Sequence, residues 1–213
     1  MNTSCVIAAI GESSLHQKWI NKHSKFDLRL IIYDDSYEKF KSDSPYVTQA
    51  KGYKFTLIYD YLNNNPTIID RYNYFFFPDD DISINTAGIH KLFRYMKKYD
   101  LAIAQPAIVN SYYSHPHTLR VETSKIRFTN FVEIMMPCFS KDALRRVLFT
   151  FNATKYGWGI DFHWGDILEY RHMNMAIIDD IYSVHTRPVR SSHYAELNDY
   201  LKRNNLSGKI FTT

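Results

Sequence analysis

The stretch Tyr74-Phe75-Phe76-Phe77-Pro78-Asp79-Asp80-Asp81 puts three adjacent carboxylates directly after an apolar run. Such a run is typical of a buried β-strand, and α/β proteins place their chemistry where parallel strands end at the edge of the sheet. Three neighbouring acids repel one another, so a bound divalent cation is the simplest compensation if the segment lies in a cleft. The alternative is an acidic turn that caps the following helix.

Strand-like and helix-like patterns alternate around this stretch. Apolar runs with period 2 or without interruption predict strands at 6–10, 26–32, 74–77, 101–105, 176–178 and 182–185. Apolar positions at helical spacing and serine caps predict helices at 13–20, 48–62, 89–96, 141–149, 161–170 and from 191 through 201. Residues 110–128 show no sustained period and are typical of a long loop or small hairpin that forms a lid or binding loop. The alternation predicts an α/β sandwich around a mostly parallel sheet, built as one domain over residues 1–213.

Composition narrows the class of protein. The 26 Lys and Arg against 22 Asp and Glu leave a net charge of +4, spread along the chain, which argues against a nucleic acid polymer as partner. Aromatic residues make up 16%, more than a core requires, and predict rings on a binding surface. Cys5 and Cys138 lack metal or disulfide spacing. Because the start of the chain lacks a leader and no apolar run could span a membrane, we expect a cytoplasmic protein, with peripheral membrane contact left open.

The spacing of Asp79 and Asp81 suits a metal site. Side chains alternate along an extended chain, so these two carboxylates can face the same side while Asp80 faces away. Oxygen ligands favour Mg²⁺ or Mn²⁺, which keep open positions that a diphosphate can complete. His185, at the end of a late strand, is either a packing residue or a third ligand, and Arg187 and Arg190 beyond it are candidates for binding phosphate.

The segment Tyr156-Gly157-Trp158-Gly159-Ile160-Asp161 combines glycines, an indole and a carboxylate at a helix start. In a functional interpretation, Trp158 is a platform for a sugar ring and Asp161 is a general base that takes a proton from an acceptor hydroxyl. In a structural interpretation, Trp158 is a core ring and Asp161 a helix N-terminal charge. Asp34 and Asp35 leave a similar choice between turn formers and acceptors for a nucleoside.

Several motifs are missing from the sequence. It contains no G-x-G-x-x-G, G-x-x-x-x-G-K-[ST], H-E-x-x-H or G-x-S-x-G. Their absence disfavours dinucleotide dehydrogenases, P-loop NTPases, zincins and serine hydrolases.

The order of strand, Asp-x-Asp, Gly-Trp-Gly-x-Asp and a late strand ending in histidine resembles nucleotide-sugar glycosyltransferases of the GT-A type. Residues 132–140, 158–161 and 184–185 resemble more narrowly an uncharacterised glycosyltransferase-like family known only as a domain of unknown function, over roughly 26–189. The resemblance implies a GT-A-like three-layer α/β/α sandwich with a mostly parallel central sheet. It also implies a divalent metal at Asp79, Asp81 and His185, and Asp161 in the acceptor pocket.

The resemblance leads to the following expectations for the site. Nucleotide binding is assigned to Asp34, Asp35, Lys54, Asp79 and Arg187, and acceptor binding to Trp158 and Gly159. Phe162 follows Asp161 where the family often has a second acid, so the identity of the base and the stereochemistry of transfer stay open.

The expected function is metal-dependent transfer of a sugar, with Mn²⁺ or Mg²⁺, from a nucleotide-diphosphate donor such as a UDP-sugar to a glycan or other hydroxyl acceptor. Two alternatives share the same residues. One is a nucleotidyltransferase or metal phosphohydrolase, and the other is a non-catalytic module on the same fold that binds carbohydrate or nucleotide.

Overall fold

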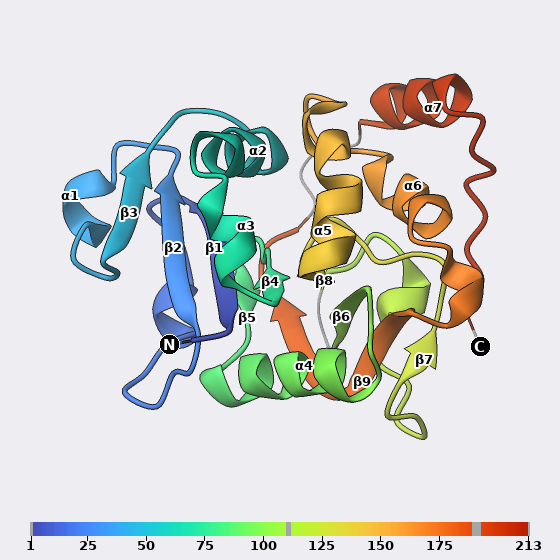
Figure 1. The fold of residues 1–213 in the computed structure, drawn as a ribbon, viewed down its shortest axis with the longest axis horizontal. Helices are drawn as coiled ribbons and strands as arrows, with labels where there is room; N and C mark the ends of the chain where they lie inside the picture. The colour runs from blue at the N-terminus through green and yellow to red at the C-terminus, as the bar shows by residue number, and fades with distance from the viewer. Residues whose placement is uncertain (1, 110–111, 189–192, 213) are drawn as a thin grey trace.

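The computed structural model describes residues 2–109, 112–188 and 193–212, and its centre is a nine-stranded sheet (Figure 1). The strands follow one another across the sheet in the order β3-β2-β1-β4-β8-β6-β9-β5, with β7 paired to β9. Their bounds are β1 Ser4–Ile10, β2 Asp27–Ile32, β3 Tyr46–Gln49, β4 Tyr74–Phe76, β5 Ile82–Ser83, β6 Ile103–Ile108, β7 Arg127–Phe128, β8 Cys138–Ser140 and β9 Met175–His185.

The sheet is mixed but mostly parallel. Strands β1 to β4 pair in parallel, and so do β6 and β9, while β8 lies antiparallel between β4 and β6. Because β8 is antiparallel to both β4 and β6, these two strands run the same way, and so does β9, which is parallel to β6. The carboxyl ends of β1, β2, β4 and β9 therefore reach the same edge of the sheet, where ligands of open α/β sheets bind.

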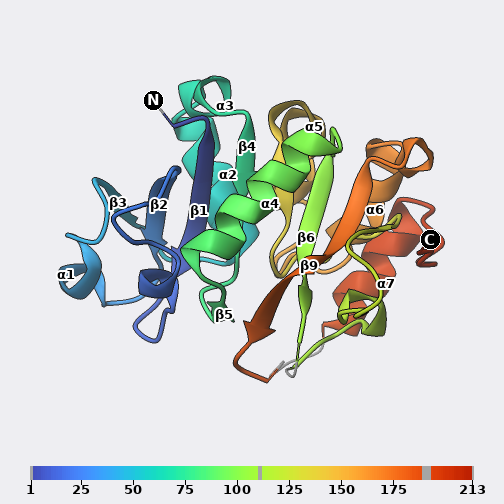
Figure 2. The same cartoon turned by 90° about the horizontal axis from the view of Figure 1, so that it is seen from below.

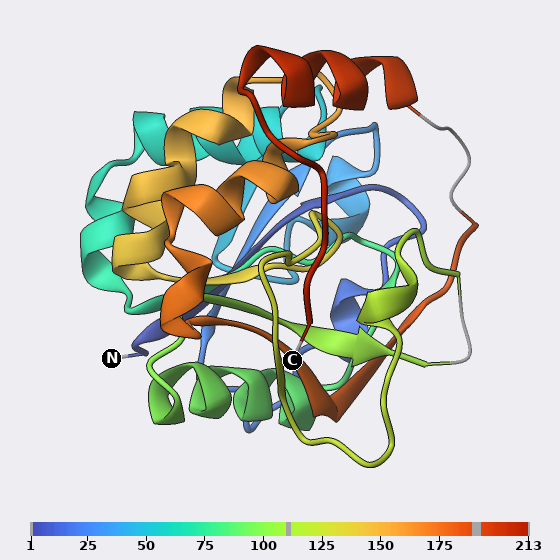
Figure 3. The same ribbon diagram turned by 90° about the vertical axis from the view of Figure 1, so that its right-hand side faces the viewer.

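Helices cover both faces of the sheet, which gives three layers. Strand β1 is buried throughout, with Cys5, Ile7 and Ala9 in one core and the alternate residues in the other, as the period of two requires. One core is closed by α2 (Lys54–Asn64), α3 (Thr67–Arg71), α5 (Lys141–Val147), α6 (Ile160–Ile167) and α7 (Tyr194–Arg203). The other is closed by α1 (Tyr37–Phe40) and α4 (Thr86–Lys98), and α4 crosses that face of the sheet in Figure 2. Helix α7 is outermost in its layer (Figure 3).

Two helix predictions near the amino terminus are wrong in part. The expected helix at 13–20 is only a 3₁₀ turn, His16–Lys18, because the Ser14 hydroxyl accepts from the His16 N–H two residues on and forms a local turn instead of a helix cap. The helix expected at 48–62 begins at Lys54, because 46–49 pairs with β2 as the edge strand β3. Apolar positions at helical spacing did not reveal this short polar edge strand.

The second half of the chain differs in smaller ways. The late strands expected at 176–178 and 182–185 are one continuous strand, β9, whose pairing with β6 shifts register after Pro106. The described part of 110–128 is mainly irregular, with a 3₁₀ turn at Pro116–Thr118 and the two-residue strand β7 at its end. Two further 3₁₀ segments lie at Leu148–Asn152 and Tyr170–His172. The expected helix start at 191–192 and the candidate Arg190 lie outside the described residues.

Cys5 and Cys138 are both buried and unbonded to each other. Within the described ranges, every helix is too short or too polar to cross a lipid bilayer.

Candidate active site

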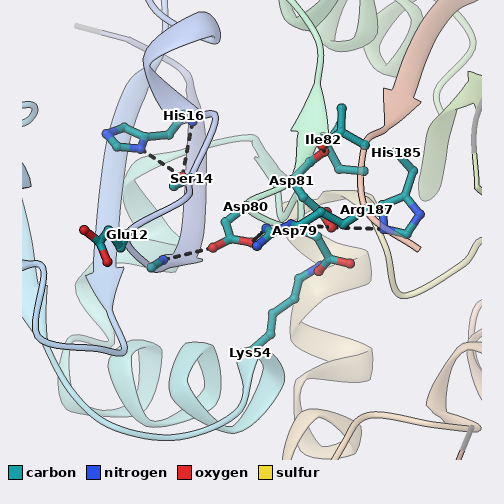
Figure 4. A network of polar contacts seen from close by, with 12 residues as sticks. Glu12, Ser14, His16, Lys54, Asp79, Asp80, Asp81, Ile82, His185 and Arg187 are labelled. Carbon is teal, nitrogen blue, oxygen red and sulfur yellow. Dashed lines mark hydrogen bonds and ion pairs between the residues drawn. The ribbon is translucent and has the colours of Figure 1, made fainter. Parts of the chain in front are cut away.

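The three aspartates lie in the loop after β4, at the carboxyl edge of the sheet (Figure 4). The loop is fixed by its backbone, since the Asp79 N–H donates to Met135 O at 2.8 Å. Asp80 points toward the ends of β1 and β2, where its Oδ2 accepts from the Gly11 N–H at 2.9 Å and from the Tyr33 hydroxyl at 2.8 Å. Asp80 thus joins three strand ends, and it is buried and bonded as a structural residue would be.

Asp79 is paired with Lys54 from the first turn of α2. The Lys54 Nζ donates to Asp79 Oδ1 at 2.7 Å, to Ile134 O at 2.7 Å and to Met135 O at 2.9 Å. All three ammonium donors are therefore used. Burial lowers the pKa of Lys54 and raises the pKa of Asp79, while the ion pair opposes both shifts.

Asp81 is held by His185, the last residue of β9, and by Arg187, which lies just beyond it. The Arg187 Nε donates to Asp81 Oδ2 at 3.0 Å, and its Nη2 pairs with Asp80. The His185 Nε2 lies 3.2 Å from Asp81 Oδ2. Burial alone would raise the pKa of Asp81, but His185 and Arg187 lower it overall. Burial lowers the pKa of His185, but the hydrogen bond and the charge of Asp81 raise it by more, so the pKa of His185 is raised overall.

Asp81 and His185 bring together donor atoms of the kinds that bind a divalent cation. Asp81 Oδ1 is buried and has no hydrogen-bond partner, as expected of an atom that awaits a cation, and His185 is beside it. Lys54, however, occupies one oxygen of Asp79. Among the residues described by the structure, no three His, Cys, Asp or Glu side chains are gathered in a metal-binding arrangement. The structure thus brings Asp81 and His185 together, and the full set with Asp79 stays a prediction.

A pocket of about 630 Å³ opens beside Asp79 and will be called the Glu133 pocket. It lies between the β4 and β9 ends, α6, α7 and the segment that follows β6. Its lining comprises Asp79, Tyr113, Ser114, His115, Glu133, Ile134, Met135, Trp158, Gly159, Asp161, Phe162, His185, Pro188, Tyr194 and Leu197.

Two buried acids, Glu133 and Asp161, face this pocket. Burial raises the pKa of Glu133 to about 7. Burial and then the charge of Glu133 raise the pKa of Asp161 to about 8. The sequence had singled out only Asp161. The signal that could have found Glu133 is its position as an acid within the apolar run 131–138. Burying such a carboxyl group is costly unless it has a partner or a ligand.

Trp158 and Gly159 reach the pocket on a loop with unusual backbone geometry. Gly157 and Gly159 have φ of +85° and +95°, a region that favours glycine. The Glu196 carboxylate of α7 accepts from the N–H groups of Lys155 at 2.9 Å, Tyr156 at 3.1 Å and Trp158 at 3.2 Å. The loop is therefore held in place by a side chain from the outermost helix.

A second pocket of about 520 Å³ adjoins the first and will be called the Arg187 pocket. It is lined by Ala9, Tyr33, Gly52, Tyr53, Lys54, Asp79, Asp80, Asp81, Arg187 and Pro188. The two pockets share Asp79 and Pro188. Lys54 and Arg187 line only the Arg187 pocket, which also contains all three aspartates, whereas Glu133 and Asp161 line only the Glu133 pocket.

Asp34 and Asp35 line neither of these two pockets. Asp34 accepts from the N–H groups of Glu12 and Ser36, as a turn former does, and Asp35 pairs with Lys51 at the surface. Their assignment to nucleotide binding stays a prediction that the geometry does not favour.

Solved structures share the arrangement of sheet and helices described above. TarS of S. aureus matches with a TM-score of 0.57 at 12% identity, over 88% of this chain and 37% of TarS. Its fragment 1–349, solved with UDP-GlcNAc, matches with a TM-score of 0.57 at 11% identity, over 95% of this chain and 64% of the fragment. A proposed nucleotide-diphospho-sugar transferase from Desulfovibrio desulfuricans G20 matches with a TM-score of 0.51 at 14% identity, over 96% of both chains.

At these identities the likeness establishes the fold alone, an α/β fold shared with TarS and with the proposed transferase. The chain spans little more than a third of TarS. The chain belongs to the family described as Protein of unknown function (DUF707), which matches residues 8–130 and 125–206. No curated protein sequence matches it. The GT-A-like fold is thus confirmed in outline, and so is the resemblance to a family of unknown function.

Proposed function

We propose that this protein transfers a sugar from a nucleotide-diphosphate donor, most simply a UDP-sugar, to a hydroxyl group of a glycan or other acceptor. The observation that carries the proposal is the meeting, at Asp79, of a pocket that contains Lys54 and Arg187 with a pocket that contains the buried acids Glu133 and Asp161. A donor diphosphate needs cations, and an acceptor hydroxyl needs a base, within reach of one reacting carbon. The complex of the similarly folded TarS fragment with UDP-GlcNAc supports this choice of donor.

The Arg187 pocket suits the donor. The Arg187 guanidinium can bind two phosphate oxygens at once, and Lys54 adds a buried positive charge behind Asp79. Tyr33 and Tyr53 in the lining offer rings on which a base can stack. Asp81 and His185, with Asp79, would hold Mn²⁺ or Mg²⁺, which would offset negative charge on the departing diphosphate.

The Glu133 pocket suits the acceptor. Trp158 offers a face for a sugar ring, and Gly159 lets the chain pass close beside it. Asp161 and Glu133 both line this pocket, and a carboxyl group is available there to take the acceptor proton. As the acceptor oxygen bonds to the anomeric carbon, the carbon–oxygen bond to the diphosphate breaks and its electron pair leaves with the nucleotide.

Product analysis tests the proposal. The protein is incubated with UDP-GlcNAc, UDP-glucose and UDP-galactose, with and without Mn²⁺, and the products are separated by chromatography. We expect UDP together with free or transferred sugar. Release of UMP or pyrophosphate would replace the proposal with attack at phosphorus, and binding without any product would leave a non-catalytic binding module. An Arg187→Gln variant, which loses the cation, should bind UDP at least tenfold more weakly.

A further inference from the structure

The two acids of the Glu133 pocket use their oxygen atoms differently. Both oxygens of Asp161 accept backbone hydrogen bonds, Oδ1 from the Phe162 N–H at 3.2 Å and Oδ2 from the Ile134 N–H at 3.4 Å. Glu133 Oε2 is buried and has no hydrogen-bond partner. A buried oxygen without a partner is costly unless a ligand completes it. Of the two carboxyl groups, Glu133 is the one with an oxygen left for an incoming hydroxyl.

The backbone around Glu133 is also tied to residues of the sheet and of the Arg187 pocket. The Glu133 N–H donates to the Oε1 of Gln105, a fully buried residue of β6, at 2.7 Å. The carbonyls of the next two residues, Ile134 and Met135, accept from the same Lys54 ammonium that binds Asp79. One short segment therefore links Glu133 to the Asp79 side of the Arg187 pocket. Such a rigid link is what holds a reacting group in position for transfer.

The charged groups around Glu133 shift its pKa in both directions, in addition to the effect of burial. Asp79 raises the pKa of Glu133, while a hydrogen bond from Ser114 and the charges of His185 and Lys54 lower it. A carboxyl group with a pKa of about 7, such as Glu133, is suited to exchange a proton near neutral pH.

We propose that Glu133 is the catalytic base of the transfer proposed above, and that Asp161 is a positioning residue for the Glu133 segment. The acceptor O–H proton moves to Glu133 Oε2, and the acceptor oxygen forms its bond to the anomeric carbon. The bond from that carbon to the diphosphate breaks, and its electron pair leaves on the nucleotide. Asp161 holds the Ile134 N–H, and so the peptide that follows Glu133.

Matched isosteric variants test the assignment. UDP release, UDP affinity and thermal unfolding are measured for wild type, Glu133→Gln and Asp161→Asn between pH 5.5 and 9, with a UDP-sugar that wild type turns over. Turnover by Glu133→Gln should be about 10²–10⁴-fold slower than by wild type, with unchanged UDP affinity. Its rate should also no longer decrease as the pH is lowered below about 7. Turnover by Asp161→Asn should be less than tenfold slower, and its rate should still decrease as the pH is lowered below about 7. Glu122→Gln is the control, because that side chain is 87% exposed and lines neither pocket.

The outcomes separate the inference from the function on which it rests. A large loss in Asp161→Asn with a small loss in Glu133→Gln would make Asp161 the base and overturn the inference, while sugar transfer would stand. Equal large losses would overturn the division of roles. Absence of UDP release by wild type would overturn both proposals. If Glu133→Gln does not fold, Glu133→Asp keeps the carboxylate one methylene shorter and should show an intermediate rate that still decreases below about pH 7.

Discussion

Replacing Lys54 by methionine leaves an unbranched side chain that is one atom shorter, and it removes the charge and the donors of the ammonium group. The variant leaves Asp79 and the carbonyls of Ile134 and Met135 without the ammonium that binds all three. Removing one partner of a buried ion pair costs ~3–5 kcal/mol. The Asp79 side chain is 36% exposed, so water recovers part of this loss. We expect destabilisation by about 2–3 kcal/mol, or a fall in Tm of roughly 4–12 °C for a chain of this size.

Thermal and urea unfolding of Lys54→Met against wild type measure this loss. Lys51→Met is the matched control, because Lys51 forms an exposed pair with Asp35 and its removal should cost ~0–1 kcal/mol. Binding of UDP, followed by calorimetry, should weaken in Lys54→Met and stay unchanged in Lys51→Met.

A double variant shows whether the unpaired carboxylate causes the loss. Adding Asp79→Asn to Lys54→Met removes the buried charge that the single variant leaves uncompensated, so the double variant should be more stable than Lys54→Met alone. If Lys54→Met unfolded at the wild-type temperature, or if the double variant were less stable than the single one, the account of this pair would be wrong.

Three further predictions concern separate parts of the molecule. Asp81→Asn and His185→Ala should each remove most of the Mn²⁺-dependent part of UDP binding while Tm changes little. Titrations with and without EDTA check this, and unchanged metal dependence in both variants would place the cation elsewhere. Burial lowers the pKa of His117 to about 4. The unfolded state therefore binds more protons below pH 6.5, and wild-type stability should fall by up to ~1.4 kcal/mol for each pH unit as the pH is lowered from 6.5 to 4. Urea unfolding should show a shallower dependence in His117→Gln and the wild-type slope in the exposed control His23→Gln. Gly159→Ala places a side chain at φ of +95°, with its Cβ 3.0 Å from the Tyr200 ring, so it should destabilise the protein by about 1–3 kcal/mol. It should also alter the tryptophan fluorescence through Trp158, because Trp19 and Trp164 are fully buried. An unchanged Tm would contradict the strain argument.

The sequence was sufficient for elements whose pattern comes from burial. The runs that became β1, β2 and β4 are buried on both faces and read as continuous or alternating apolar segments. Edge strand β3 escaped because its residues are half-buried or exposed, so no apolar period marks it. The antiparallel position of β8 also could not be read from three residues, since its direction depends on pairing with β4 and β6 across the chain.

The site was predictable where residues follow strand ends in the sequence. Asp81, His185 and Arg187 were expected at one edge of the sheet, and the structure places them in contact. The roles of the individual aspartates were less accessible. The pairing of Lys54 with Asp79 depends on how α2 approaches the segment 134–135, a contact between residues 80 positions apart that no local pattern encodes. The expectation that Asp80 faces away from its neighbours is wrong in one respect, because Arg187 bridges Asp80 and Asp81.

The Glu196 carboxylate, which accepts three backbone N–H groups of the Trp158 loop, changes how the C-terminal part of the chain should be treated in the laboratory. Helix α7 is the outermost helix of its layer, and a domain trimmed before it would keep every strand from β1 to β9. Such a trimmed protein would retain its secondary structure and still lose the shape of the Glu133 pocket. Folding alone is therefore a poor criterion for choosing expression boundaries in this family, and boundaries should be chosen beyond α7.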